Sequence, residues 1–306
     1  MGGRIAIVGS LMTDLVVRVP RLPQAGESLI GHGFATFVGG KGGNQAIAAA
    51  RAGADAVHMV GRVGADAFGT EIVRTLEADR VDCRFVSRDE AVGTGVAVPM
   101  VLDDGSNSII AIPQANLRVS VADIMAAREV LTAVDVLLAQ FEVNMEAVEA
   151  AMRTAREAGV RVILNPAPIA PHPPDIFRMA HVVVANEVEA AALVPECGGD
   201  HGAEALALLA KGPAVAIVTL GAEGAIVATQ EERFFVPAYQ VKAIDSVGAG
   251  DAFCGALAVG LCERMDLAEA VRFASAAGAL SVTRAGAAAS LPVRGAIDEL
   301  RGSGER

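Results

Sequence analysis

Long apolar runs are absent from this chain of 306 residues. Its longest apolar stretch, 252–262, is well short of the ~18 residues that a membrane-spanning helix needs, so we expect no membrane span. The apolar segment Ile5–Val8 is too short for the core of a signal peptide. Because hydrophobic residues still make up 53% of the chain, it can fill a sizeable core, which excludes intrinsic disorder.

Basic residues are in the minority, since 25 Lys and Arg stand against 36 Asp and Glu, and the net charge is −11. Nucleic acid is therefore not an expected partner, because binding a phosphate backbone requires stripes of Lys and Arg. A small phosphorylated ligand is not excluded, because backbone N–H groups at a helix start bind phosphate without net positive charge.

Cysteine and histidine are scarce, and neither forms a recognisable site. The 4 cysteines include no Cys-x-x-Cys pair, which favours a reduced, cytoplasmic protein. The 5 histidines lack the spacing of a metal site, and the chain has no Gly-x-Ser-x-Gly nucleophile motif.

Short Val/Ile/Leu runs alternate with Ala-rich stretches that have helical spacing. The expected strands are Ile5–Val8, Val57–Val60, Val136–Leu138, Val160–Leu164, His181–Val184, Val215–Thr219 and Ala225–Ala228. The expected helices are Gly43–Arg51, Ala67–Ala78, Met145–Ala158, Glu187–Leu193, Glu204–Ala210, Ala252–Cys262 and Leu267–Thr283. Apolar strands that alternate with helices predict an α/β fold, doubly wound, with a mostly parallel sheet covered by helices on both faces.

Two segments lack helical spacing, at about 11–38 and 92–112. The second contains two apolar runs, 93–102 and 106–112, and the Asp-Asp-Gly between them is a hairpin signal. Such small β-segments cannot fold alone. We therefore expect them to pair with each other as a small β-sheet lid over one edge of the main sheet, within a single domain that spans 1–306.

The first motif with chemical meaning is Gly39-Gly40-Lys41-Gly42-Gly43-Asn44-Gln45, which opens an Ala-rich helix. Its glycines allow a ligand to approach the backbone closely, and the helix start offers free N–H donors. The Asn44 amide suits sugar hydroxyls because it both donates and accepts. A tight turn with a solvated Lys41 is the alternative.

The second motif is Asp245-Ser-Val-Gly248-Ala249-Gly250-Asp251, which precedes the apolar helix. Its glycines favour an anion-binding turn at the positive end of that helix. Beside an anion, Asp251 makes sense as a general base that takes a proton from an attacking hydroxyl. The alternative is that Asp251 only caps the helix.

Further polar residues follow other expected strands. Asn186 and Glu189 have the spacing of a capping box, and could equally orient Mg²⁺ waters around phosphate. The turn 219–224 could lie against a nucleotide or be only a hairpin. Asp14 and Glu142 come just past strand ends, where open α/β sheets bind ligands.

In order and spacing, these motifs resemble the ribokinase family, also called the PfkB carbohydrate kinases, from about Ile5 to Pro292. The lysine of the first motif is typical of the ribokinase branch. The segments Leu164–Pro168 and Ser281–Arg284 also resemble ribokinase sequences. The resemblance implies ATP-dependent phosphorylation of a sugar's primary hydroxyl with Mg²⁺, and a β-lid that forms a homodimer.

The resemblance also implies roles for individual residues. It makes Asp251 the catalytic base and Gly248, Ala249 and Gly250 the anion hole. The residues implied to hold the sugar are Met12, Asp14, Gly40, Lys41, Asn44, Glu142, and, from the lid, Ala97 and Ile112. The residues implied to bind the nucleotide are Asn186, Thr219, Leu220, Gly221, Ala222, Glu223, Gly224, Gly250 and Ser275, with Glu189 ordering a Mg²⁺ water. A monovalent cation, K⁺, is implied near Asp245, Val247, Ser281, Arg284, Gly286 and Ser290.

Three positions depart from the family pattern, and one of them, Gly43 in place of the usual alanine, carries little weight. Ribokinases usually have Asn where this chain has Met12, and a thioether cannot donate a hydrogen bond to a ribose hydroxyl. The same methionine resembles that of 2-deoxyribokinases. Ser275 stands where Asn or His is common near the adenine. We expect a pentose kinase for ribose or 2-deoxyribose; the alternatives are a kinase for another small sugar or a nucleoside, and a non-catalytic binding protein.

Overall fold

The computed structural model describes residues 3–104 and 106–304. Its main sheet has nine strands in the order β13-β12-β11-β10-β9-β8-β1-β4-β5. The strands are β1 (Arg4–Val8), β4 (Ala56–Gly64), β5 (Val81–Asp89), β8 (Val136–Gln140), β9 (Arg161–Asn165), β10 (Val182–Asn186), β11 (Val215–Thr219), β12 (Gly224–Thr229) and β13 (Arg233–Pro237). Only β12 runs antiparallel to the other strands of this sheet, so the mostly parallel sheet is confirmed.

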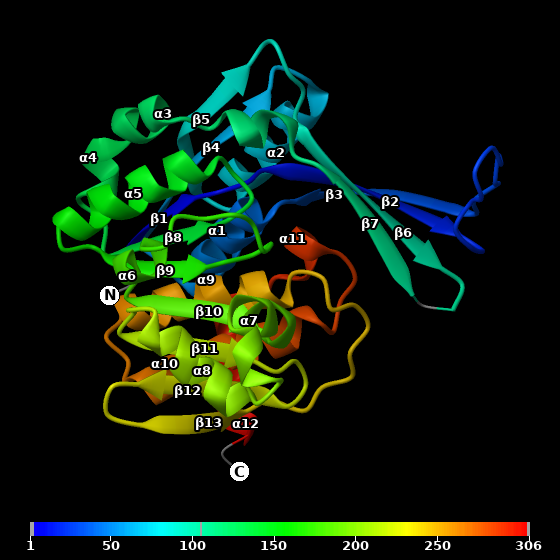
Figure 1. The fold of residues 1–306 in the computed structure, drawn as a ribbon. Coiled ribbons are helices and arrows are strands. Elements are labelled where there is room, and N and C mark those ends of the chain that lie inside the picture. Colours follow the sequence, from blue (N-terminus) through cyan, green and yellow to red (C-terminus); the bar gives the residue numbers. More distant parts are fainter. Residues whose placement is uncertain (1–2, 105, 305–306) are drawn as a thin grey trace.

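Helices cover both faces of this sheet (Figure 1). Within β1, Ile5 and Ile7 belong to one core cluster and Ala6 and Val8 to another, so alternate side chains are buried on opposite faces. This is why the central strands of the sheet are nearly continuous apolar runs. The helices are α1 (Lys41–Ala52), α2 (Ala67–Ala78), α3 (Val121–Ala126), α4 (Arg128–Leu131), α5 (Met145–Glu157), α6 (Ile176–Met179), α7 (Glu187–Leu193), α8 (His201–Ala210), α9 (Ala249–Cys262), α10 (Leu267–Ser281), α11 (Ala287–Ser290) and α12 (Arg294–Gly304), with short 3-10 turns η1 (Gln114–Arg118) and η2 (Pro195–Cys197).

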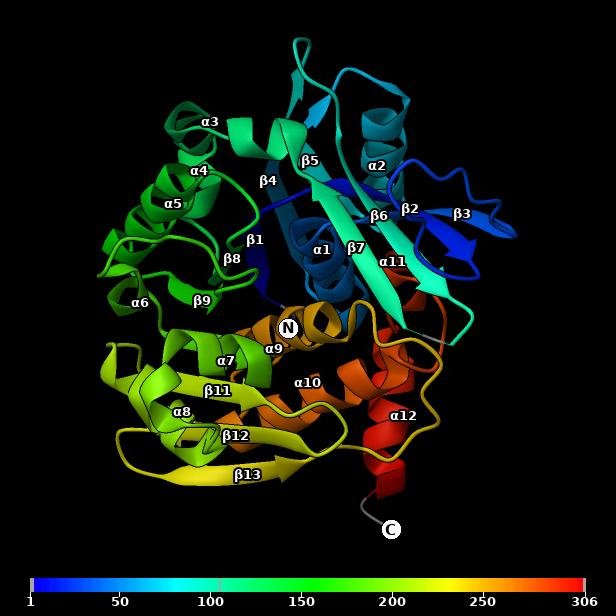
Figure 2. The ribbon, with the colours of Figure 1, turned by 45° about the vertical axis from the view of Figure 1, so that its right-hand side comes forward.

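A second, four-stranded sheet stands beside the first as a lid (Figure 2). Its order is β3-β2-β6-β7, with β2 (Met12–Val19), β3 (Gly33–Gly39), β6 (Gly95–Leu102) and β7 (Asn107–Ile112). The two β-segments singled out in the sequence therefore pair with each other, through β2 and β6. The hairpin joins β6 to β7, and its Gly105 lies outside the described residues.

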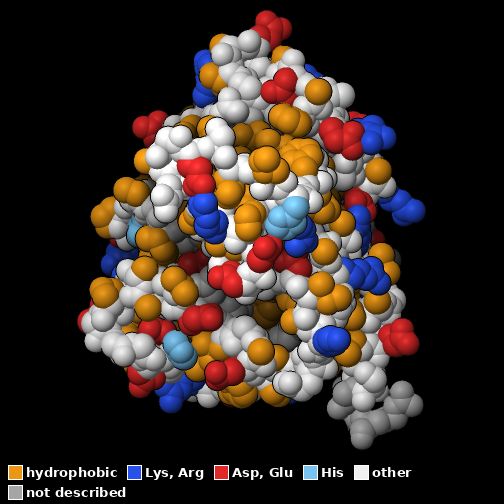
Figure 3. All heavy atoms as spheres, turned by 90° about the vertical axis from the view of Figure 1, so that its right-hand side faces the viewer, with side chains coloured by type: hydrophobic (Ala, Val, Ile, Leu, Met, Phe, Trp, Pro, Cys, Tyr) orange, Lys and Arg blue, Asp and Glu red, His pale blue; other side chains and the backbone are white. Residues whose placement is uncertain are grey.

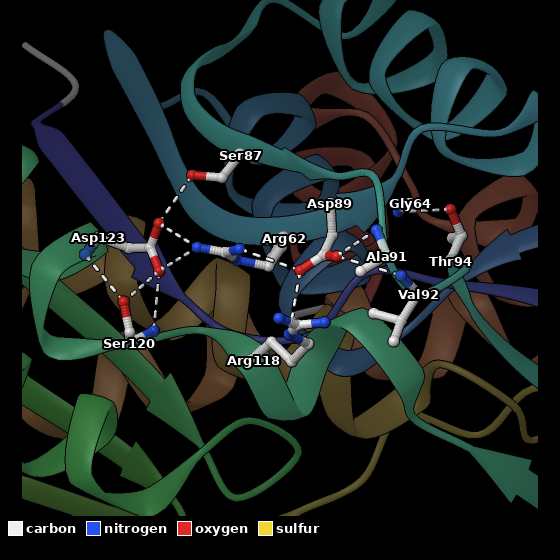
Figure 4. Close-up of polar contacts among 10 residues, drawn as sticks. All are labelled: Arg62, Gly64, Ser87, Asp89, Ala91, Val92, Thr94, Arg118, Ser120 and Asp123. Carbon is white, nitrogen blue, oxygen red and sulfur yellow. Dashed lines mark hydrogen bonds and ion pairs between the residues drawn. The ribbon is translucent and has the colours of Figure 1, made fainter.

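The base of the lid is fixed to the main sheet by an ionic cluster (Figure 4). Arg62 of β4 bonds Asp89 at 3.1 Å and Asp123 at 2.8 Å, and Arg118 of η1 reaches Asp89 at 3.2 Å. Asp89 precedes the segment that enters β6, and η1 follows β7. Both connections of the lid hairpin are thus held where they meet the sheet.

The expected strands and helices are all present, with ends shifted by a few residues. The sequence patterns did not predict β5, β13, the C-terminal helix α12 and several short helices. β5 is an edge strand whose residues are mostly half-buried and include several charged side chains, and so it lacks a continuous apolar run. Among the described residues, none of the helices has the length and apolar character to cross a membrane.

Candidate active site

Two helices meet closely at the carboxyl edge of the main sheet and bring the first two motifs together. α1 begins at Lys41, inside the glycine-rich motif, and α9 begins after Gly248. They approach closely because Gly255 has no side chain: a Cβ there would lie 2.6 Å from Ala48 Cβ and 2.8 Å from the Gln45 carbonyl oxygen. Close packing at Gly255 therefore places Asn44 and Gln45 against Asp251.

Asp251 is buried in the first turn of α9 and does not cap it. Gly248 occupies the cap position with φ 83°, a left-handed conformation that favours glycine, so the capping alternative for Asp251 is wrong. The Asp251 carboxylate instead accepts hydrogen bonds from Asn44 Nδ2 at 2.9 Å and Gln45 Nε2 at 3.0 Å. Burial raises the pKa of Asp251 to about 6, against the opposing effects of Lys41 and the two amides.

Two more carboxylates and one ammonium group surround Asp251. Burial raises the pKa of Asp14 to about 6, helped by the charges of Glu142 and Asp251. Burial lowers the pKa of Lys41, but the charges of Asp251 and Glu142 outweigh it, so this pKa is raised. The glycine-rich turn is thus not a simple turn with a solvated lysine. The motifs that carry Asp14, Lys41, Glu142 and Asp251 lie in one site.

Free hydrogen-bonding groups at this site suit a hydroxylated ligand. Asn44 Oδ1 is buried and has no partner among the described residues. The carboxylate of Glu142 accepts the Lys41 N–H at 3.0 Å and the hydroxyl of Ser10, which fixes it at the start of α1. An unpartnered buried acceptor is costly unless a ligand hydroxyl fills it.

Strand register decides which lid residues share the face of Asp14. Asp14 pairs with Ala97, and Ala97 pairs with Ala111, so these three lie on one face of the lid. Ile112 pairs with Val96 and belongs to the opposite face. By register, Ala111 and not Ile112 shares the Asp14 face, so the strand pairing does not support the expected contact of Ile112 with the sugar. Met12, two residues before Asp14, lies on the Asp14 face and is 5% exposed.

The start of α9 offers backbone donors, as expected for an anion hole, with one change. Ala249 already donates its N–H to the Ser246 carbonyl at 3.3 Å. The first N–H groups of a helix lack intrahelical acceptors, which leaves those of Gly250 and Asp251. An anion bound at this helix start would therefore accept hydrogen bonds from the N–H groups of Gly250 and Asp251, and not from that of Ala249. Gly248 forms the turn before them.

Two adjoining cavities lie beside this helix start. The larger, about 410 Å³, is lined mainly by small and apolar residues of β12, α9, α10 and the 238–243 loop. The smaller, about 200 Å³, is lined by Lys41, Asn186, Glu189, Gly248 and Asp251, among others. Figure 3 shows a hollow on this side of the molecule with acidic side chains at its border. The pair suits a nucleoside next to its phosphates.

Most residues predicted for the nucleotide line the larger cavity. These are Asn186, Thr219, Gly221, Ala222, Gly224, Gly250 and Ser275. Leu220 and Glu223 do not; they close the turn between β11 and β12, where the Glu223 N–H donates to the Leu220 carbonyl at 3.0 Å. The turn is therefore both a hairpin and part of the cavity wall.

Asn186 and Glu189 form the capping box that their spacing predicted. The Asn186 side chain accepts the Glu189 N–H at 2.8 Å, and the Glu189 carboxylate accepts the Asn186 N–H at 2.9 Å. Both residues also line the smaller cavity, so the cap directs one carboxylate toward it. Carboxylate oxygens of this type can accept hydrogen bonds from water bound to Mg²⁺.

The residues predicted for a monovalent cation lie in the loop before α9 and in the segment from the end of α10 to the end of α11. Asp245 accepts the N–H of Val247 at 3.0 Å and that of Gly286 at 2.9 Å, which joins the two segments. The hydroxyls of Ser281 and Ser290 donate to carbonyls of their own helices, at 2.8 and 2.9 Å. Any cation there would thus be held chiefly by backbone carbonyls, including those near Arg284.

Sequence reasoning missed several site residues. The loop 238–243 lines the larger cavity but has no motif. Gln140 and Asn165 are buried at the ends of β8 and β9 and connect to Asp251 through Gln45. The signal that could have identified both residues is a polar side chain at the last position of an otherwise apolar strand.

A family model, pfkB family carbohydrate kinase, matches residues 3–294. The chain belongs to this family. It is an ATP-dependent carbohydrate kinase of the ribokinase branch. Ribokinase of Bacillus subtilis is 38% identical over 97% of this chain and 98% of its own length. Deoxyribokinase of Salmonella typhi is 36% identical over 94% and 95%. The structure of Arabidopsis thaliana ribokinase complexed with ribose and ATP matches with a TM-score of 0.90 at 30% identity, over 98% of this chain and 99% of that one.

These similarities confirm the predicted family, fold and enzyme class of this kinase. They do not distinguish between the two sugars considered for Met12, because ribokinases and deoxyribokinases resemble the chain at similar identity over nearly its whole length.

Proposed function

We propose that this kinase transfers the γ-phosphate of ATP to the primary hydroxyl of a pentose, ribose or 2-deoxyribose, giving the 5-phosphate. The observation that carries the proposal is the position of Asp251. Its carboxylate lies among the Asp14, Lys41 and Glu142 groups and also lines the cavity that begins at the α9 N-terminus. A sugar hydroxyl and a phosphate that met there would both be next to one base.

In the proposed reaction, Asp251 takes the proton of the sugar hydroxyl while the oxygen of that hydroxyl forms a bond to the γ-phosphorus. The bond from that phosphorus to the ADP oxygen breaks in the same step, and ADP leaves. The N–H groups of Gly250 and Asp251 and the positive end of α9 stabilise the charge on the transferring oxygens. Mg²⁺, when bound, neutralises the phosphates, and Glu189 would hold its water.

The sugar is proposed to lie under the lid, between β2 and the start of α1. Asp14, Asn44, the Gly40–Lys41 backbone and Glu142 supply donors and acceptors for its hydroxyls, with Ala97 and Ala111 above it. A lid over the sugar excludes water, which limits hydrolysis of ATP.

We expect Met12→Asn to shift preference toward ribose. A ribose 2-hydroxyl placed against the Met12 thioether stays unpaired, which costs ~1–3 kcal/mol, whereas 2-deoxyribose loses nothing there. An asparagine at position 12 restores a partner. The ratio of kcat/KM for ribose to that for 2-deoxyribose should rise about tenfold. An unchanged ratio would place sugar discrimination elsewhere.

The lid is proposed to pair two copies of the chain. Phe34, Ile110 and Ile112 share the face opposite Asp14 by register and are 68%, 52% and 45% exposed. Hydrophobic side chains gather on this side of the molecule in Figure 3. Burial of such a patch stabilises association. Light scattering should give twice the monomer mass, and Ile110→Asp should give the monomer; a wild-type monomer would contradict the proposal.

Two further elements belong to the proposal. K⁺ would bind at the two segments that Asp245 joins, where backbone carbonyls supply oxygen ligands. The cytoplasm is the proposed compartment, because all four cysteines are free thiols.

Steady-state ADP release with ribose and with 2-deoxyribose, in the presence of Mg²⁺ and K⁺, tests the proposal. Sugar-dependent ADP release with either pentose supports it. If neither pentose is turned over, a panel of other small sugars and nucleosides identifies the substrate, and the pentose assignment fails. ATP binding without turnover of any acceptor would instead indicate a binding protein.

A further inference from the structure

Four buried amide side chains form a hydrogen-bonded network behind Asp251. Gln45 and Gln140 are 0% exposed, and Asn44 and Asn165 are 5% and 7% exposed. Gln45 Nε2 donates to Asp251 Oδ1 at 3.0 Å and to Asn165 Oδ1 at 3.3 Å, while Gln45 Oε1 accepts from Gln140 Nε2 at 2.5 Å. Both N–H groups of the Gln45 amide are therefore used.

The direction of these bonds is fixed by a backbone carbonyl. Asn165 Nδ2 donates to the Val184 carbonyl oxygen at 2.9 Å, and a carbonyl can only accept. Asn165 must then present its own oxygen to Gln45, and Gln45 must present its NH₂ group to Asn165 and Asp251. Gln140 follows this orientation: its Nε2 donates to Gln45 Oε1, and its own Oε1 is buried without a partner among the described residues. If the Gln45 amide were flipped, its oxygen would face Asn165 Oδ1 and Asp251 Oδ1, which are also acceptors, and these buried groups would be left unpaired.

Strand pairing builds the network. Gln140 and Asn165 are the last residues of β8 and β9 and are partners in register. Their side chains meet Gln45 because the sheet edge lies against α1. Asn44 contacts the other carboxylate oxygen, Asp251 Oδ2, and we have proposed that Asn44 also binds the sugar. Gln45 has no such second role.

We propose that Gln45, held in one amide orientation by Asn165 and Gln140, is a positioning residue for the reaction: it fixes Oδ1 of Asp251, so that Oδ2 is the atom that removes the sugar hydroxyl proton. The inference rests on the proposed role of Asp251 as general base. Asn165 and Gln140 act through Gln45 and touch neither substrate nor base.

A pH profile separates this role from a purely structural one. The charged or titratable groups that face Asp251 are Lys41 of α1, Glu142 after β8, Asp14 of the lid, and Cys254 of α9. Replacing Gln45 by methionine changes none of these charges. It removes a donor to the ionised carboxylate, so the pKa of Asp251 rises further and the base is protonated at a higher pH.

The experiment measures kcat/KM for the sugar against pH in the wild type and in Gln45→Met, Gln140→Met and the double variant. In Gln45→Met, the acidic limb should move up by about one pH unit, with KM changed far less than kcat. Gln140→Met should move it by less, and the double variant should match Gln45→Met alone, because Gln140 acts through Gln45. Gln230→Met, on the exposed β12–β13 turn, is the matched control and should change nothing.

An acidic limb in Gln45→Met that coincides with the wild type overturns the inference. If Gln45→Met does not fold, Gln140→Met decides in the same way. Additive losses in the double variant would also overturn it, since two independent packing defects add. Failure of the underlying proposal looks different: Asp251→Asn would then remain active.

Discussion

Asp251→Asn is expected to lower kcat for sugar phosphorylation by about 10²–10⁴-fold, the contribution typical of a general base. Asparagine keeps the size of the side chain but cannot accept a proton. The raised pKa of Asp251, about 6, still leaves the carboxylate ionised at neutral pH, so the wild type has its base available there. The measurement is steady-state ADP release at saturating sugar and ATP.

The loss should appear in turnover and not in ATP binding, because Asp251 does not line the larger cavity, which suits the nucleoside, and a carboxylate beside the phosphates does not attract them. Titration with a fluorescent ATP analogue should therefore give similar affinities for both proteins. Asp175→Asn, at an exposed carboxylate before α6, is the matched control and should keep full activity. A fully active Asp251→Asn would remove Asp251 from the mechanism.

Gly255→Val is expected to lower the free energy of unfolding by about 3 kcal/mol and to reduce activity with it. A Cβ at this position would lie 2.6 Å from Ala48 Cβ and 2.8 Å from the backbone N of Ala49, and neither neighbour is a flexible side-chain end. α1 and α9 must then separate. Because α1 carries Asn44 and α9 carries Asp251, the site opens when they do.

Urea denaturation measures the loss of stability, and ADP release measures the loss of activity. Gly295→Val in α12 is the matched control, since a Cβ there meets nothing within 4 Å. It should leave the stability nearly unchanged or slightly higher, because valine has a somewhat better helix propensity than glycine. Equal stabilities of the two variants would show that α1 and α9 tolerate separation, contrary to this account.

Motif order predicted the parts of the site that depend on residues near each other in sequence. The glycine-rich turn, the Asn186–Glu189 cap and the start of α9 are local structures, and each forms close to its predicted residues. The alternating apolar runs likewise predicted the main sheet, because strands buried on both faces leave a strong signal.

Features that depend on register between distant strands were not predictable. The family resemblance implied that Ile112 contacts the sugar, but the pairing of β6 with β7 puts Ala111, and not Ile112, on the Asp14 face of the lid. A shift of one residue reverses the face, and no local pattern fixes it. For the same reason, the contact of Gln140 and Asn165 with Gln45 required the β8–β9 register.

The most direct test of the central claim is the identity of the product. Ribose or 2-deoxyribose, incubated with ATP and Mg²⁺, is followed by ³¹P NMR without proton decoupling. The account predicts a phosphomonoester signal split into a triplet by the two protons on C5, growing in step with ADP and absent with Asp251→Asn. ADP accompanied only by inorganic phosphate, or a doublet from a phosphate on a ring carbon, would contradict transfer to the primary hydroxyl.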